Sequence, residues 1–237
     1  MRVINIRTIS GPNIYSHQPV LVMKLDLQEL TEKESCEFQG FNERLVEILP
    51  GLNTHVCSKG YEGGFIERLK EGTYFGHVIE HVALELTELA GVPTFHGKTR
   101  QTDKPGIYHV IIEYKAERGT AHLLRIAVAL VDAILKGKDF PLDQEIAEAK
   151  RIIARTELGP STRTVVEAAE RRGIPWQRLD EESLVQLGYG KSRKLVAAAM
   201  TSLTSAIGSD IASDKDLTKR LLNRAGIPVP QGEIVQN

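Results

Sequence analysis

The residues best suited to chemistry lie in one five-residue stretch, His77-Val78-Ile79-Glu80-His81. On an α-helix, side chains four positions apart leave the same face about 6 Å from each other, so His77 and His81 can share one metal ion. Glu80 lies beside that face, where it can take a proton from water and return it to a leaving amine. The order His-x-x-Glu-His is the inverted form of the zinc-hydrolase pattern. The stretch therefore predicts a metal-dependent hydrolase in which Glu80 is catalytic and Zn²⁺ or another divalent metal is bound by His77 and His81.

A catalytic zinc ion needs a third protein ligand next to an open position. His55 is the first choice, because it precedes a Gly-rich turn at 60–64 that can fold back onto the helix. Glu85 is a second candidate, but it lies about 12 Å along the helix axis from His77. We therefore expect Glu85 to support a ligand rather than to bind the metal. Four more side chains remain open as the third ligand: Cys57, His96, His109 and Glu113.

A non-catalytic alternative has to be kept, because a pattern of five common residue types also arises by chance. On that alternative, His77 and His81 are hydrogen-bonded structural residues. A second motif, Gly188-Tyr189-Gly190-Lys191, has the glycines and lysine of a phosphate-binding loop. It lacks the G-x-x-x-x-G-K-[ST] spacing, so an ordinary turn is the preferred interpretation.

The overall composition narrows the class of protein. The 237 residues include 30 Lys and Arg against 31 Asp and Glu, a balance that argues against a nucleic-acid or anionic-membrane partner. The sequence has no apolar run near the roughly 20 residues that span a bilayer. Its two cysteines, Cys36 and Cys57, cannot build a disulfide framework. These features predict a soluble protein of the reducing cytoplasm.

The histidines are positioned by a predicted helix over 73–90, whose apolar residues recur at three- and four-residue spacing and which Gly91-Val92-Pro93 should end. Further helices are predicted at 40–49, 65–70, 121–135, 142–155, 161–172 (with a Ser or Thr cap) and 215–224 (opened by Ser213-Asp214). Strands are predicted at 1–6, 20–27, 107–114, 183–187 and 195–201. The expected class is α/β, with an α+β first domain, a boundary near Leu158-Gly159-Pro160 and a small α/β segment after it.

Sequence blocks along nearly the whole chain carry a family resemblance. In the first part they are Ser10-Gly11-Pro12-Asn13, residues 40–45, His55-Val56-Cys57-Ser58, residues 63–65 and 72–73, and the stretch 77–86. In the second part they are residues 158–162 and 185–190, Thr204-Ser205, Asp214-Lys215 and residues 225–230. The first set resembles the N-terminal domain of the cyanophycin synthetase family. The second resembles the entry to the ATP-grasp module of the same family.

The resemblance implies a function for each part. The family makes cyanophycin, a poly-aspartate backbone with arginine on each side-chain carboxylate, by two ligations that use ATP and Mg²⁺. Residues 1–158 would be the N-terminal domain that holds the polymer, and 159–237 the beginning of the ATP-grasp module. In some members the N-terminal domain also cuts polymer into primers, at a metallohydrolase site that matches His77, Glu80 and His81. The whole enzyme tends to be a homo-oligomer.

Two departures from the family pattern bear on these expectations. Ser10 stands where the family often has Arg, which puts one polymer contact in doubt. The sequence also stops before the nucleotide-binding strand, lid and metal-binding carboxylates of an ATP-grasp module, so we expect ligation to need the remaining modules of the same polypeptide. Polymer-binding and nucleotide-binding residues stay unassigned. The alternative is a polymer-docking module without catalysis.

Overall fold

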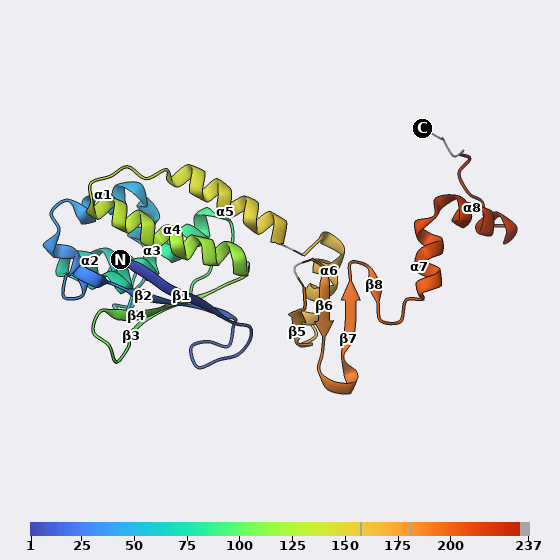
Figure 1. Cartoon of the computed structure of the whole chain (residues 1–237), viewed down its shortest axis with the longest axis horizontal. Coiled ribbons are helices and arrows are strands. Elements are labelled where there is room, and N and C mark those ends of the chain that lie inside the picture. The colour runs from blue at the N-terminus through green and yellow to red at the C-terminus, as the bar shows by residue number, and fades with distance from the viewer. Residues whose placement is uncertain (157, 181, 233–237) are drawn as a thin grey trace. The chain divides into compact units, whose positions relative to one another are not determined.

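The computed structural model describes residues 1–156, 158–180 and 182–232. Its chain divides into two compact units, Met1–Glu157 and Leu158–Asn237, and each is described by itself. Within the described residues there are eight α-helices and two four-stranded antiparallel sheets (Figure 1). The predicted mixed α/β class is confirmed.

The first unit contains the predicted histidine helix and most of the other predicted elements. Its helices are α1 (Phe41–Ile48), α2 (Gly64–Glu71), α3 (Phe75–Leu89), α4 (Glu117–Leu135) and α5 (Leu142–Thr156), with a short 3-10 helix η3 (Pro50–Thr54). Its strands are β1 (Arg2–Ile9), β2 (Val20–Asp26), β3 (Gly97–Gln101) and β4 (Ile107–Glu113).

The sheet of the first unit supports the helices on one face. Its order is β1-β2-β4-β3, so β3 is an edge strand. Helix α3 contacts β3 and β4, whereas α4 contacts β1 and β2. Alternate side chains of the central strands, such as Met23 and Val110, enter the core between sheet and helices, because successive residues of a strand point to opposite faces.

Helix α3 is buried along most of its length, which explains the apolar character of its sequence. Val78, Val82 and Leu86, at the predicted spacing, are fully shielded from solvent. The helix ends at Leu89, and Gly91 then takes a φ of +81° that favours glycine. The predicted stop at Gly91 is thus confirmed, and the helix holds most of its polar residues in buried surroundings.

The second unit has a small core. Its elements are α6 (Pro160–Glu170), α7 (Ala206–Ser213), α8 (Lys215–Arg224), β5 (Trp176–Arg178), β6 (Leu184–Leu187), β7 (Lys194–Ala197) and β8 (Met200–Thr201). Its core consists of Val166, Val185 and Val196, where α6 packs on the sheet. Helices α7 and α8 contain no buried residue.

Some predicted details were wrong. The single strand predicted at 195–201 is two antiparallel strands, β7 and β8, because the chain reverses at Ala198, whose φ is +54°. Helix α6 begins at Pro160 after Gly159, not at a Ser or Thr cap, because proline suits the first helical position. Helix α4 starts at Glu117, four residues before the predicted start. By contrast, the Asp214 cap of α8 is confirmed, since its carboxylate accepts a hydrogen bond from the Leu217 N–H.

Within the described residues, no helix is both long and apolar enough to cross a membrane.

Candidate metal centre

Three ligand-type side chains meet on α3. One ligand atom each of His77, Glu80 and His81 can be chosen so that all three lie within 4.8 Å of one another. Glu80 and His81 are buried, and His77 is half-buried. Such a compact group of two imidazoles and a carboxylate is the donor chemistry that zinc prefers.

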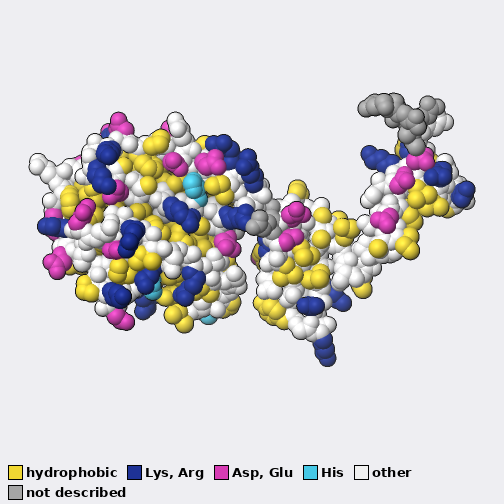
Figure 2. Space-filling model, viewed as in Figure 1, with side chains coloured by type: hydrophobic (Ala, Val, Ile, Leu, Met, Phe, Trp, Pro, Cys, Tyr) yellow, Lys and Arg dark blue, Asp and Glu magenta, His cyan; other side chains and the backbone are white. Residues whose placement is uncertain are grey.

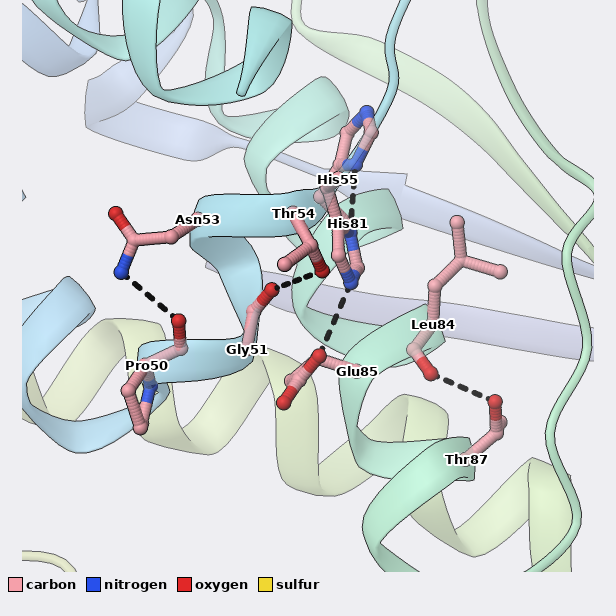
Figure 3. Close-up of polar contacts among 9 residues, drawn as sticks. All are labelled: Pro50, Gly51, Asn53, Thr54, His55, His81, Leu84, Glu85 and Thr87. Carbon is pink, nitrogen blue, oxygen red and sulfur yellow. Dashed lines mark hydrogen bonds and ion pairs between the residues drawn. The ribbon is translucent and has the colours of Figure 1, made fainter. Parts of the chain in front are cut away.

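Each imidazole is held by a specific neighbour. The Thr73 hydroxyl lies 3.1 Å from Nδ1 of His77. The buried Phe65 ring, at the start of α2, stacks on the His81 ring with 4.0 Å between ring centres. Nδ1 of His81 lies 3.0 Å from Nδ1 of His55, the residue that follows η3 (Figure 3). Because Nδ1 of both helical histidines is engaged, Nε2 is the atom that each has for a metal.

Burial also sets the protonation of the group. It lowers the pKa of His77 to about 4, helped by the charge of Arg68. It lowers the pKa of His81 to about 2, helped by His77 and His55. Both imidazoles are therefore neutral at pH 7, the form that binds metals. The two imidazoles thus fit a divalent metal in both donor type and protonation.

Glu80 is the acid of this group. Burial raises its pKa to about 7, although hydrogen bonds from Thr99 and the charge of Lys98 oppose the rise. A carboxyl with a pKa near neutrality can both accept and return a proton. Gly97 makes room for this side chain, since a Cβ there would lie 2.8 Å from Cγ of Glu80.

The structure places the predicted third ligands at different distances from this group. His55 lies beside His81, and its Nε2 lies 3.0 Å from Oε2 of the buried Glu85. The four remaining candidates do not join the compact group that the described residues form. Cys57 Sγ accepts the Lys59 N–H, and Glu113 accepts the Ser16 hydroxyl.

Of the other two histidine candidates, His109 lies in β4 and His96 directly precedes β3. His109 pairs across the strands with Lys24 and Arg100. Burial, then the charges of Lys24 and Arg7, lower the pKa of His109. The main-chain carbonyl of His96 accepts the N–H of Glu113.

Sequence reasoning missed three supporting residues. Thr73 stands four positions before His77, so helical spacing alone signals its reach toward that ring. Phe65 and Gly97 come from α2 and β3, and nothing in their local sequence marks them as neighbours of Glu80 and His81.

The comparisons with known proteins agree with the family resemblance. Residues 22–136 match the model of the cyanophycin synthase-like N-terminal domain. This chain is homologous to the N-terminal region of cyanophycin synthetases. The cyanophycin synthetase of Trichormus variabilis is 46% identical over 240 residues, which cover 99% of this chain and 27% of that protein. Those of Geminocystis herdmanii and Synechocystis sp. are 44% and 42% identical, and each is matched over 28% of its length. The chain thus spans little more than a quarter of the curated cyanophycin synthetases that it matches.

Proposed function

We propose that this chain is a part of cyanophycin synthetase that binds cyanophycin and cleaves it by metal-dependent hydrolysis. The observation that carries the proposal is the compact, largely buried group of His77, Glu80 and His81, with two neutral imidazoles beside a carboxyl of pKa about 7. Homology to cyanophycin synthetases supports the choice of polymer.

Each residue has a stated role in the proposed hydrolysis. His77 and His81 hold Zn²⁺ or another divalent metal through Nε2, with Thr73 and Phe65 fixing the two rings. When bound, the metal supplies a Lewis acid and lowers the pKa of water toward 7. Glu80 takes a proton from the attacking water and delivers it to the amine that leaves. The shielded surroundings of Glu80 keep bulk water from competing for that proton.

The surface of the first unit supports binding of a zwitterionic polymer. Figure 2 shows Lys and Arg side chains interspersed with Asp and Glu over the face in view. Exposed charges of both signs can pair with the alternating carboxylate and guanidinium groups of cyanophycin.

The wider role of the chain is also proposed from homology. Residues 1–158 would be the polymer-binding domain, and 159–237 the start of an ATP-grasp module. The remaining ligase modules of the same polypeptide would supply ATP and Mg²⁺ binding. The whole enzyme would be a cytoplasmic homo-oligomer that ligates aspartate and arginine.

The test is incubation of the purified chain with insoluble cyanophycin, with and without a metal chelator, and mass spectrometry of soluble fragments. We expect chelator-sensitive release of fragments. Glu80→Gln should slow release by a factor of about 10² to 10⁴, the usual contribution of a general acid–base residue. Glu88→Gln, which changes an exposed glutamate on the same helix, is the matched control. Undiminished release by Glu80→Gln would refute the mechanism.

The rival function is polymer docking without catalysis. It is favoured by the contacts of His77 with Thr73 and of His81 with His55, in which a protein group engages Nδ1 of each ring. A chain that co-sediments with cyanophycin but releases no fragments at any metal concentration would establish this rival.

A further inference from the structure

We propose that His55 and Glu85 form a positioning relay that fixes the tautomer of His81, so that its Nε2 presents a lone pair to the metal. This inference rests on the metal site of the proposed function and extends it to two residues outside that site. On this proposal neither His55 nor Glu85 binds the metal directly.

The relay consists of two hydrogen bonds in series. Nδ1 of His81 lies 3.0 Å from Nδ1 of His55, and Nε2 of His55 lies 3.0 Å from Oε2 of Glu85. Figure 3 shows dashed contacts joining the three side chains in the order His81, His55, Glu85. Only 13% of the His55 side chain and 7% of the Glu85 side chain are exposed, so water competes little for these bonds.

The Glu85 carboxylate, at the end of the relay, fixes the direction of both hydrogen bonds. An ionised carboxylate can only accept hydrogen bonds, so Nε2 of His55 carries a proton and its N–H donates a hydrogen bond to Oε2 of Glu85. In a neutral imidazole the other nitrogen is then an acceptor. Nδ1 of His55 therefore accepts from Nδ1–H of His81, which leaves the lone pair of His81 on Nε2. Partners of this kind orient metal-binding histidines and raise their basicity.

The main chain near Gly51 keeps Glu85 in place. A Cβ on Gly51 would lie 2.0 Å from Oε1 of Glu85, so the carboxylate packs directly on this glycine. This oxygen lies at the far end of the flexible Glu85 side chain. Gly51→Ala should therefore displace the carboxylate and leave the backbone in place.

The experiment measures Zn²⁺ affinity of the full chain by competition with a chromophoric chelator, together with the visible spectrum of the Co²⁺ form. Glu85→Gln and Gly51→Ala should each weaken Zn²⁺ binding about 10- to 100-fold and leave the Co²⁺ coordination number unchanged. The controls are Glu88→Gln and Gly11→Ala, since Glu88 is exposed and a Cβ on Gly11 would meet nothing within 4 Å. Both controls should bind Zn²⁺ like the unaltered chain. Melting temperatures of the metal-free variants verify that each is folded.

A second measurement does not depend on the metal. Nitrogen-15 spectra of the histidine rings in the metal-free chain should show His81 protonated at Nδ1 and His55 protonated at Nε2. In Glu85→Leu, which removes the acceptor, this preference should be lost at both rings.

The outcomes are distinct. His81 protonated at Nε2, or a Glu85→Gln variant with unaltered Zn²⁺ affinity, would overturn the relay. If the Co²⁺ spectrum of His55→Gln shows one ligand fewer than that of the unaltered chain, the relay would also be overturned and His55 would be the third ligand. If the unaltered chain binds Zn²⁺ and the variants weaken binding, but no cyanophycin is cleaved, the relay stands and the hydrolase proposal fails.

Discussion

The two units differ in how much apolar surface they bury, and the candidate metal centre lies in the unit with the larger core. The first unit packs α3 and α4 against one side of a sheet, and this core also surrounds His81, Glu80 and Glu85. The second unit has three buried valines as its core, and α7 and α8 leave Ile207 and Leu221 exposed. Burial shifts the pKa values of the α3 residues, which requires a core large enough to exclude water.

The largest expected effect tests the core that supports the site. Phe65→Ala removes a fully buried ring that stacks on His81, so the free energy of unfolding should fall by about 3–5 kcal/mol. Segment-resolved hydrogen exchange should show the loss in the first unit. The matched variant Val185→Ala should raise exchange in the second unit alone. Unchanged exchange of α3 in Phe65→Ala would contradict the assignment of this core.

Metal binding should sharpen the contrast between the units. Zn²⁺ at a hundred times its dissociation constant should raise the free energy of unfolding of the first unit by about 2.7 kcal/mol. The exchange of α6 and α8 should stay the same, because the proposed ligands all lie in the first unit. Equal protection of both units would show that the metal binds elsewhere.

The pH dependence of the metal-free chain tests the buried charges. Near pH 5.5, one unit below the ordinary histidine pKa of 6.5 and one unit above the ordinary glutamate pKa of 4.5, the unfolded chain binds almost two protons at His77 and His81 and almost none at Glu80. The folded chain, with pKa values of about 4, 2 and 7, binds only the Glu80 proton. Unfolding thus takes up one net proton, and stability should rise with pH by about 1.4 kcal/mol per unit from these groups.

Glu80→Gln provides the internal check on that slope. The variant has no carboxyl at position 80, so the folded state binds none of these protons and unfolding takes up two. The slope of stability against pH should therefore double to about 2.8 kcal/mol per pH unit. Urea denaturation in the presence of chelator measures both slopes. A variant with a shallower slope would contradict the raised pKa of Glu80.

The smallest effect concerns the second unit. Asp214→Ala removes the cap of α8 and should cost that helix about 1 kcal/mol. Hydrogen exchange of α8 measures the change, and α3 should be unaffected. Asp103→Ala, at an exposed bend, is the control. A loss of protection in α3 would contradict the separation of the two units.

Helices with a strong apolar period could be predicted from sequence, because burial of one face imposes that period. Helix α3 is the best case, since both its course and its end at Gly91 followed from residue types. Strand β3 was missed because Gly97-Lys98-Thr99-Arg100-Gln101 lies at the sheet edge and has no apolar alternation. Helix α7 was missed because it is short and buries no side chain.

The candidate site also has one part that the sequence predicts and another that only the structure shows. The spacing of His77, Glu80 and His81 is local, so a helix brings them together whatever the rest of the fold. The contact between His55 and Glu85 joins residues 30 positions apart and depends on how η3 packs against α3. The rise along the helix correctly separated Glu85 from His77, but it could not show that another ring would bridge Glu85 to His81.

Gly97 has a consequence for identifying active relatives. A side chain at this position would overlap Glu80 and press on Leu84 and Ile112. If the proposed hydrolysis holds, a homologue that retains the complete His-x-x-Glu-His motif would still be inert with a side chain here, because a single added methyl group in β3 displaces the proposed general base. Surveys of the family, and any transplant of the motif into a designed scaffold, should score the residue at this strand position together with the helix.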